Sequence, residues 1–420
     1  MNNTSIVIIG GGPSGMMSAI SARQHNPLAE ITLIEKNGTL GRKMSISGGG
    51  RCNITNTCDT PTLISKIQTN PRFLYSALTS FDSIKLLKML NSSGLPTKVE
   101  DNGRVFPVSD KATDVIETFE KQLINIKIQY FTTVVNIKKE KNKFVVKTVK
   151  RNNGKTITNN IYSEKVIIAT GGLSASPTGS TGDGYKFAQS LSHTLTKKFY
   201  PAVVPLKTKE SWSHSLQGLS LRNVGVTTKV NKKIVFRDIG DMVFAHFGVS
   251  GPVILRASAH ITGKHFSEPH IFLDFFPEKK ELELEQELLN IFQTQPNKNT
   301  KNSLEDILPK KSVTIISELS NIHLEKKNRD IKKEERRRLI ENIKSLKLTV
   351  TGDMGFNNAI ATNGGVSVKE INPTTMESKL VDGLYIVGEV LDVNAYTGGY
   401  NLQIAYSTGY SAGKHAAKTI

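Results

Sequence analysis

The sequence predicts an α/β fold whose main domain is built from both ends of the chain. Near the N-terminus, a β-branched run from Ser5 to Ile9 leads into a glycine-rich turn and then a helical pattern that ends at about Gln24. The block 383–418 has the same order of strand, glycine loop and helix. Between these ends the pattern changes to short strands and then to helices, which indicates an inserted segment.

The first half of the chain supplies most of the expected α/β elements. The string EITLIEK, which begins at Glu30, is expected to give a second strand that ends at Glu35, and the glycine- and hydroxyl-rich segment 36–56 is expected to be a long loop. One helix is predicted over 71–94, ending at Gly94. A hairpin with its turn at Asn102-Gly103 and a helix over 111–125 follow.

The second half contains the expected insert. Residues 128–172 are rich in strands, with a hairpin turn at 151–154 and a buried strand that ends in two glycines. From 194 to 276 we expect short strands and turns, with a helix after Gly251. Residues 277–342 have helical character, and a strand returns at 346–352.

Charge is the unusual feature of the composition. The 420 residues have a net charge of +18 and a pI near 9.6, which favours a polyanionic partner, either nucleic acid or an anionic membrane surface. The alternative is an enzyme from an organism with a lysine-rich proteome. The length allows two or three domains.

The cysteines and the hydropathy indicate where the protein works. Cys52 and Cys58 have a C-x5-C spacing that matches no usual zinc or dithiol pattern, so we expect no metal site and a reducing compartment. No stretch reaches the ~18 apolar residues of a membrane span. The protein is therefore expected to be cytoplasmic, without a membrane partner.

A glycine motif at the start of the first predicted helix indicates a dinucleotide. Gly10, Gly12 and Gly15 satisfy G-x-G-x-x-G, and Glu35 stands 20 residues after Gly15 at the end of the next strand. In such a unit the glycines let the backbone approach a pyrophosphate at the helix N-terminus, and the acid binds an unphosphorylated ribose. The alternative is a glycine turn without a ligand. The predicted contacts here are Gly10, Gly12, Pro13, Ser14, Gly15 and Glu35.

The C-terminal block selects FAD over NAD. Its strand ends at Gly388 and Glu389, and Gly398 and Gly399 precede the last helix. A second glycine-opened helix suits a ligand with two ends, and its dipole would stabilise negative charge on a reduced flavin. Because no second G-x-G-x-x-G occurs, NADH or NADPH is expected to bind only transiently as the electron donor.

Several strings together resemble one known family. The segments 10–15, 41–56, 244–255 and 362–409 are similar to those of the BaiN/RdsA-type bacterial flavoproteins, and the resemblance extends over essentially the whole chain. It implies a glutathione-reductase-like FAD-binding Rossmann domain with an inserted β-barrel and helical subdomain. The implied bounds are 1–193 and 355–420 for the FAD-binding domain, 194–276 and 343–354 for the barrel-like substrate domain, and 277–342 for the helical subdomain.

The same resemblance implies further cofactor contacts. The segment 42–53 is expected against the pyrophosphate and the isoalloxazine, Glu389 stands where related flavoproteins bind the ribityl chain, and Asn53, Asn401 and Gln403 are expected to pair with flavin edges. The contacts implied in this way are Lys36, Arg42, Lys43, Ser47, Gly49, Gly50, Arg51, Asn53, Val135, Thr170, Gly171, Asp183, Gly388, Glu389, Gly398, Gly399, Tyr400, Asn401 and Leu402.

Four residues are candidates for catalysis. Cys52 is a candidate proton donor, with a small buried packing residue as the alternative. Arg51 is expected to neutralise phosphate or a developing anion. His246 is a candidate acid or substrate clamp, with a structural histidine as the alternative. Tyr396 is expected near the reacting face.

The predicted function is FAD-dependent reduction of a C=C bond with NADH. By resemblance, the substrate is uridine in large-subunit (23S) ribosomal RNA, which becomes dihydrouridine. The basic segment 325–347 would then be a phosphate-binding track, although on a small-molecule enzyme it would be a solvated face. One alternative is a small-molecule ene-reductase for a steroid- or enoate-like substrate, and another is a ribosome-associated RNA-binding flavoprotein with structural FAD. The oligomeric state stays open.

Overall fold

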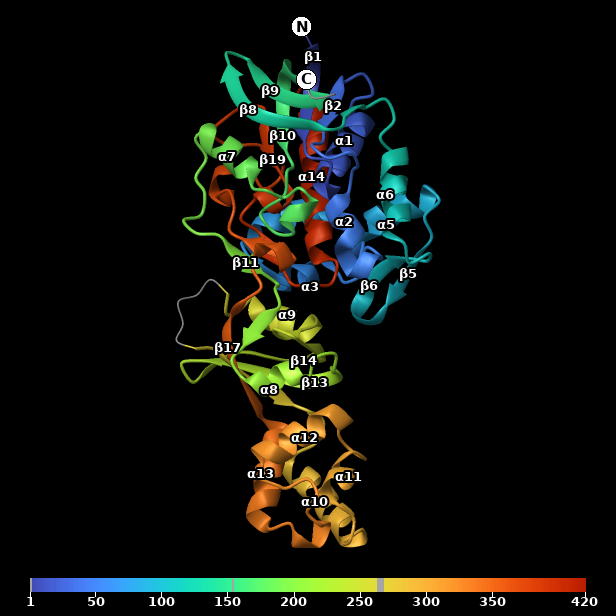
Figure 1. Ribbon diagram of the computed structural model, residues 1–420. Coiled ribbons are helices and arrows are strands. Elements are labelled where there is room, and N and C mark those ends of the chain that lie inside the picture. The colour runs from blue at the N-terminus through green and yellow to red at the C-terminus, as the bar shows by residue number, and fades with distance from the viewer. Residues whose placement is uncertain (1, 153–154, 263–267) are drawn as a thin grey trace. The chain divides into compact units, whose positions relative to one another are not determined.

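The structure, a computed structural model, describes residues 2–152, 155–262 and 268–420 (Figure 1). The chain divides into two compact units. The first comprises Met1–Ala202 together with Phe356–Ile420, and the second comprises Val203–Gly355. Both ends of the chain therefore lie in one unit, as the sequence predicts.

A parallel sheet forms the centre of the first unit. Its strands lie in the order β7, β2, β1, β10 and β19, all parallel, with Ile9 opposite both Ile34 and Ile168. The side chains of residues 6–9 of β1, of β2, of residues 166–168 of β10 and of β19 are buried, which explains the continuous apolar runs in the sequence. The bounds are β1 (Asn2–Ile9), β2 (Ile31–Ile34), β7 (Lys127–Gln129), β10 (Lys155–Ile168) and β19 (Leu384–Ile386).

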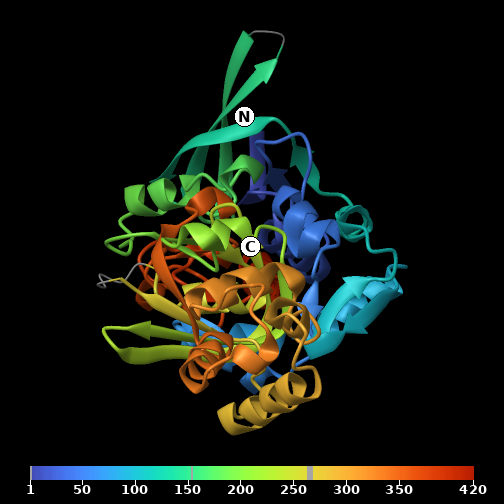
Figure 2. The ribbon, with the colours of Figure 1, turned by 60° about the horizontal axis from the view of Figure 1, so that its bottom comes forward.

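An antiparallel meander extends this sheet. β8 (Thr132–Glu140) pairs with β9 (Lys143–Asn152), and β9 pairs with the first half of β10. Figure 2 shows the β9–β10 hairpin extending beyond the rest of the sheet. The turn expected at 151–154 lies partly outside the described residues. We call the solvent-facing side of β8, β9 and the first half of β10 the meander face.

Two helices from opposite ends of the chain pack tightly against each other (Figure 1). These are α1 (Pro13–His25) and α14 (Tyr400–Lys418). A Cβ atom at Gly409 would lie 2.3 Å from the Ser14 carbonyl oxygen, and one at Gly413 would lie 2.2 Å from the Ser18 carbonyl oxygen. The contact is therefore backbone against backbone, which only glycine on α14 permits.

The prediction of a single helix over 71–94 is wrong. The segment forms η2 (Pro71–Leu74), α4 (Tyr75–Ser80) and α5 (Ser83–Ser92). The break occurs because the Asp82 carboxylate accepts a hydrogen bond from Lys85 N (2.9 Å) and so caps a new helix.

The expected loop 36–56 also contains short helical segments. These are α2 (Arg42–Ile46) and η1 (Ser47–Gly50). The hairpin predicted near Asn102 is present as β5 (Thr97–Glu100) and β6 (Arg104–Pro107), and β6 pairs with β3 (Thr55–Asn56).

Shorter elements complete the first unit. They are α3 (Thr60–Ser65), β4 (Ile67–Thr69), η3 (Asp101–Gly103), α6 (Ala112–Lys121), η4 (Ser176–Thr178), α7 (Asp183–Ser190), β11 (Tyr200–Ala202), η6 (Phe356–Asn358), β18 (Ala361–Asn363), η7 (Val368–Glu370), η8 (Gly388–Val390) and β20 (Asn394–Ala395).

A closed barrel forms one part of the second unit. Alternate residues of its strands, such as Val224, Val226 and Val230, are buried and form its core. The strand order is β12 (Leu206–Thr208), β15 (Gly248–Ser250), β14 (Lys233–Ala245), β13 (Ser220–Val230), β16 (His270–Asp274) and β17 (Leu346–Asp353), with α8 (Ser211–Ser215) and α9 (Pro252–Ser258) beside them.

Helices form the other part of the second unit. They are α10 (Glu281–Thr294), α11 (Thr300–Leu304), α12 (Lys310–Leu319), η5 (Asn328–Asp330) and α13 (Lys333–Lys344). Their buried side chains, among them Leu288, Ile316 and Leu339, form a hydrophobic core separate from that of the barrel. This separate core supports the proposal that 277–342 is a subdomain. Over the described ranges, no helix has the length and apolar character needed to cross a membrane.

Candidate functional site

Glycine- and hydroxyl-rich loops meet at the carboxyl edge of the parallel sheet. They follow β1 (10–15), β2 (35–37), β10 (170–172) and β19 (388–389). A Cβ atom at Gly10 would lie 2.5 Å from the Ala169 carbonyl oxygen, so the first and third of these loops touch. Strand order reverses between β1 and β10, and this is where open α/β sheets bind ligands.

The N-terminus of α1 presents an open cradle at this edge. Gly12 is the N-cap, and no side chain among the described residues caps the helix there. A Cβ atom on Gly12 would have no described atom within 4 Å. Uncapped backbone N–H groups beside open space, at the positive end of a helix dipole, are suited to an anion such as a pyrophosphate.

Glu35 is buried beside this cradle. Its Oε2 accepts from Gly11 N (2.8 Å), and its Oε1 accepts from Asn37 N (2.8 Å) and Asn37 Nδ2 (2.7 Å). A carboxylate offers about four acceptor positions, so this arrangement leaves room for a ribose hydroxyl. The glycine motif predicted Glu35. Asn37 belongs to no motif and was missed.

Lys36 and Asp183 were predicted as separate contacts and lie together. Lys36 Nζ is 2.7 Å from Asp183 Oδ2 and donates to Thr181 Oγ1 (2.6 Å). Burial acts to raise the pKa of Asp183, but the hydrogen bonds from Lys36 and Thr181 and the charge of Lys36 outweigh it and lower that pKa. The pair joins the segment after β2 to the start of α7.

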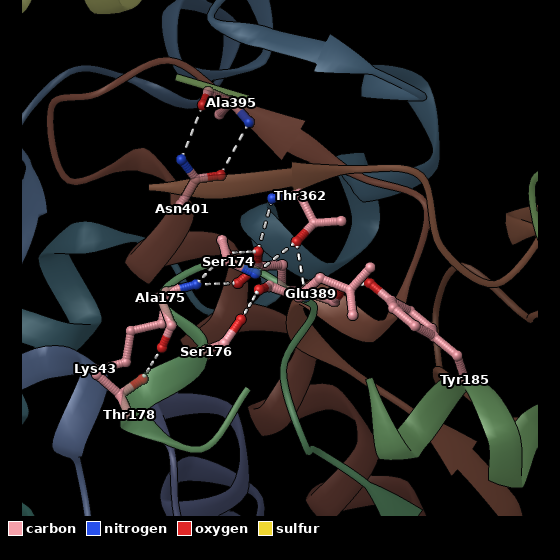
Figure 3. Close-up of polar contacts among 11 residues, drawn as sticks. Lys43, Ser174, Ala175, Ser176, Thr178, Tyr185, Thr362, Glu389, Ala395 and Asn401 are labelled. Atoms are coloured by element: carbon pink, nitrogen blue, oxygen red, sulfur yellow. Dashed lines mark hydrogen bonds and ion pairs between the residues drawn. The ribbon is translucent and has the colours of Figure 1, made fainter. Parts of the chain in front are cut away.

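A compact polar cluster surrounds Glu389 (Figure 3). The carboxylate forms an ion pair with Lys43, accepts from Ser174 Oγ, and accepts from Thr362 N at 2.7 Å. Lys43 Nζ also donates to Ser174 Oγ (2.6 Å). The sequence predicted Lys43 and Glu389. Ser174 and Thr362 belong to no motif and were missed.

The loop Ser47–Gly50 needs its glycines for backbone reasons. Gly48, Gly49 and Gly50 have φ of +58°, +70° and +88°, in the left-handed region that glycine adopts without strain. Added Cβ atoms at Gly49 and Gly50 would meet no described atom within 4 Å, so their outer side is open. The loop closes through Cys52 N, which donates to the Ser47 carbonyl oxygen (3.0 Å).

Arg51 does not have the free charge that was expected of it. Its guanidinium donates to both Glu100 oxygens (2.7 and 3.3 Å) and to Asp110 Oδ1 (3.3 Å), and it stacks 3.9 Å from the Phe106 ring centre. The hydrogen bond to Glu100 is the main cause that raises the pKa of Arg51. Two carboxylates therefore already neutralise the positive charge of Arg51, which was predicted to neutralise a phosphate or a developing anion.

Cys52 is buried inside the core of the first unit. Its thiol is fully inaccessible, and burial raises its pKa to about 12, although a hydrogen bond with Ser47 opposes the shift. Such a thiol neither contacts a ligand nor gives up its proton readily near neutral pH. The expectation of a proton donor is therefore corrected in favour of the packing alternative.

The amides expected on flavin edges hold loops together instead. Asn401 Oδ1 accepts from Ala395 N (2.9 Å), and Asn401 Nδ2 donates to the Ala395 carbonyl oxygen (2.8 Å) (Figure 3). Asn53, in the amide orientation that satisfies both partners, accepts from Gly399 N (3.0 Å) and donates to the Thr55 carbonyl oxygen (3.1 Å). The side chain of Gln403 accepts from Thr55 Oγ1 and donates to the Phe81 carbonyl oxygen.

These contacts bring the C-terminal glycine loop to the loop that carries Cys52. A Cβ atom at Gly399 would lie 2.4 Å from the Thr55 carbonyl oxygen. On the other side, a Cβ atom at Gly388 would lie 2.7 Å from Ser14 Oγ. The motifs from both chain ends therefore converge within the first unit.

Of four further predicted residues, three belong to the first unit and one belongs to the second. Thr170 lies two residues after β10, and its buried hydroxyl has no hydrogen-bond partner among the described residues. Val135 is exposed at a bulge in β8. Tyr396 is half-buried, and its N–H donates to the Lys66 carbonyl oxygen (3.1 Å). His246 belongs to the second unit, in the exposed turn between β14 and β15.

Arg42, Ser47, Gly171, Tyr400 and Leu402 complete the predicted set. Arg42 donates to Asn37 Oδ1 (2.8 Å), and Ser47 Oγ donates to the Met44 carbonyl oxygen (2.8 Å). A Cβ atom added at Gly171 would lie 2.8 Å from Ser180 Oγ. Tyr400 and Leu402 lie in the first turn of α14. Together, the anion cradle, the buried acid, the unpartnered hydroxyl and the open glycine loop fit a two-ended dinucleotide such as FAD.

Known proteins match this chain along almost its whole length. A family model described as the HI0933-like protein Rossmann domain matches residues 4–415. A relative from Clostridium scindens, named 3-dehydro-bile acid delta(4,6)-reductase, is 33% identical over 98% of this chain and 99% of its own. The ribosomal RNA dihydrouridine synthase of Escherichia coli is 29% identical over 98% of this chain and 97% of its own.

Solved structures support the fold. Quinol fumarate reductase FrdA of E. coli superposes with a TM-score of 0.52 at 16% identity, covering 100% of this chain and 71% of that one. The 3-ketosteroid-delta4-(5alpha)-dehydrogenase of Rhodococcus jostii gives 0.50 at 15% identity, covering 99% and 97%. The predicted fold class, a Rossmann domain with an inserted barrel, is confirmed, and so is the family resemblance. The chain belongs to the HI0933-like Rossmann-domain family.

Proposed function

We propose that this protein is an FAD-dependent reductase that takes electrons from NADH or NADPH and reduces a C=C bond, that of uridine in large-subunit ribosomal RNA. The observation that carries the FAD proposal is the convergence of both glycine loops, through Gly388 on Ser14 and Gly399 on Thr55, within one unit. The reductive chemistry is supported by the names of relatives that match the chain along almost its whole length.

The residues at the sheet edge have distinct proposed roles. The N–H groups that open α1 would bind the pyrophosphate, and Glu35 would bind the adenosine ribose. Lys43 and Glu389 would orient the ribityl chain, and the open side of Gly49 and Gly50 would leave room for the ring system. FAD, when bound and reduced by NADH or NADPH, would supply a hydride to one carbon of the double bond, and the chain would supply binding, orientation and access for the proton that the other carbon takes up.

Two observations favour RNA as the substrate. Relatives named ribosomal RNA dihydrouridine synthase in E. coli and Haemophilus influenzae each cover almost the whole chain. The net charge of +18 suits a polyanion far better than it suits a small apolar substrate. Because Cys52 is buried, we propose no role for its thiol in the reaction.

A strain that lacks this gene tests the substrate. Dihydrouridine is mapped in its large-subunit ribosomal RNA, and one or more sites are expected to lose the modification and to regain it when the gene is restored. An unchanged map would contradict the RNA substrate. When NADH is added to purified protein with bound FAD, the visible absorbance of the flavin should decrease. A flavin that stays oxidised after this addition would favour a structural cofactor instead.

A second function has its own supporting observation. The bile acid reductase named above is 33% identical to this chain, slightly more than the RNA-modifying relatives. A steroid with a conjugated 3-keto-diene is the matching substrate. Its NADH-dependent loss of ultraviolet absorbance by the purified protein, together with an unchanged RNA map, would establish this alternative.

A further inference from the structure

The basic segment 325–347 uses much of its charge inside the second unit. Lys326 bonds both Glu335 oxygens (2.8 Å each), Arg336 pairs with Glu285 (3.3 Å), and Lys344 pairs with Asp274 (2.8 Å). Arg338 Nε donates to the Ser320 carbonyl oxygen (2.9 Å). These four cations anchor helices and are less available to a phosphate, whereas Lys332, Lys333 and Arg337 of the same segment are exposed.

The meander face shows the opposite pattern. Residues 132–165 contain nine lysines and arginines against two glutamates, Glu140 and Glu164. Among its described residues, the exposed cations form no ion pair with any described carboxylate. The exposed cations are Lys138, Lys141, Lys143, Lys147 and Arg151, together with Lys150 and Lys155, which the strand register places on the other side of the strands. Unpaired positive charge of this density is costly by self-repulsion unless counterions or a partner neutralise it.

The strand register places several of these cations on one side of the sheet. Lys143, Lys147 and Arg151 alternate with Val145 and Val149 along β9, so their side chains share a face. At about 3.4 Å per residue, successive cations in this row are ~14 Å apart. Lys138 lies opposite Val145 on β8 and adds a charge between Lys143 and Lys147.

Neutral hydrogen-bonding groups fill the spaces between these charges. Asn136 and Asn160 flank Lys147, one on each neighbouring strand, and Thr158 lies opposite Val149. Arg151 lies opposite Thr156. Rows of lysine and arginine interspersed with amides and hydroxyls are the groups that contact nucleic-acid phosphates and sugars. Bases would find few aromatic platforms here, so the face is suited to the backbone of a folded RNA.

We propose that the meander face binds the phosphate backbone of the RNA substrate. The inference rests on the proposed function and adds a binding surface on the cofactor-binding unit. The meander starts beside the nucleotide site, because Thr132 N donates to the Glu35 carbonyl oxygen (3.0 Å). β10 runs from the meander to Ile168, two residues before Thr170. An RNA held on this face therefore contacts the same rigid sheet that carries the cofactor loops.

The test compares two variants with the same loss of charge. One is the triple variant Lys138→Gln, Lys147→Gln and Arg151→Gln, and its matched control is Lys332→Gln, Lys333→Gln and Arg337→Gln on exposed positions of the 325–347 segment. The probe is a fluorescein-labelled RNA stem–loop, titrated against FAD-loaded full-length protein over a range of salt concentrations. Bound FAD per chain and the thermal midpoint confirm that both variants fold.

The meander variant is expected to bind the stem–loop roughly ten- to a hundredfold more weakly near physiological salt, with a log–log salt slope smaller by about two to three. The control should bind within about twofold of the unchanged protein. Equal losses in both variants, or no loss in the meander variant, would overturn the proposal. So would a meander variant that loses binding to phosphatidylserine vesicles while it keeps binding to RNA.

The outcome is separable from that of the proposed function. If the deletion strain keeps its dihydrouridine and the meander variant still loses RNA binding, the substrate assignment fails and the binding surface stands. If the deletion strain loses dihydrouridine and the meander variant binds RNA normally, the reverse holds.

Discussion

Glu389 shows how one side chain organises the cofactor edge. Its carboxylate joins Lys43 from the segment after β2, Ser174 from the loop after β10 and the backbone of β18. Only Lys43 and Glu389 could be predicted from motifs, because the other two groups depend on how distant loops fold against each other. Arg51 illustrates the same limit, since a lone arginine in a glycine loop gives no hint that Glu100 and Asp110 will neutralise it.

Glu389→Gln should weaken FAD binding by about ten- to a hundredfold. The variant would lose the ion pair that fixes Lys43 at the cofactor edge and, in the proposed complex, a charge-assisted hydrogen bond to the ribityl chain worth ~1.5–3 kcal/mol. Isothermal titration of apo-protein with FAD measures the change. Glu140→Gln, at the exposed end of β8, is the matched control, and equal affinities for both variants would contradict the role of Glu389.

Cys52→Ala should keep full reductive activity and lose about 1 kcal/mol of unfolding free energy. The thiol touches only protein, so its removal leaves a small cavity in the core and no missing proton donor. Urea denaturation and steady-state turnover measure the two effects. Cys58→Ala, at a partly exposed thiol, is the control, and a loss of turnover in the Cys52 variant alone would restore the catalytic interpretation.

The buried ring of His193 should lower the free energy of unfolding at acidic pH. Its ring is buried, with Nε2 2.8 Å from Ser378 Oγ and Nδ1 3.1 Å from the Leu191 carbonyl oxygen, and burial lowers its pKa. The folded state therefore resists protonation. The contribution to stability is fully present above the unfolded pKa of ~6.5 and is lost as pH falls below it. Urea midpoints across this range should vary less for His193→Gln than for the unchanged chain.

Individual elements were predictable where the pattern was local. The parallel strands of the first unit are continuous apolar runs, and the glycine motif opens α1 at the expected residue. The division of 71–94 into η2, α4 and α5 could not be predicted, because the spacing of its apolar residues is that of one continuous helix. The sequence alone does not show that Asp82 caps a new helix. The separate helices of 36–56 were missed because their glycines resemble a loop until the left-handed turns are known.

Gly409→Ala should destabilise the protein by about 1–3 kcal/mol. Alanine normally stabilises a helix interior by up to ~1 kcal/mol over glycine, but here its Cβ would collide with the Ser14 carbonyl oxygen and push α14 away from α1. Thermal or urea unfolding measures the sign. Lys414→Ala on the same helix serves as the control, and a more stable Gly409 variant would show that the two helices are not in close contact.

At the scale of the whole molecule, the two units should respond differently to FAD. Each has its own hydrophobic core, and the cofactor loops all belong to the first unit. FAD at about a hundred times its dissociation constant should stabilise the first unit by ~2.7 kcal/mol and leave the second unchanged. Hydrogen exchange followed by mass spectrometry resolves the two units. Equal protection in both would contradict this independence.

The interlocked pair α1 and α14 also affects how the chain is made. A polypeptide is synthesised from its N-terminus, so α1 appears early and waits for its partner until nearly all other elements have left the ribosome. The second unit, Val203–Gly355, is completed before α14 is translated. Newborn chains must therefore carry an unfinished cofactor unit throughout translation, and truncation or a bulky fusion at α14 should expose it to proteases and chaperones.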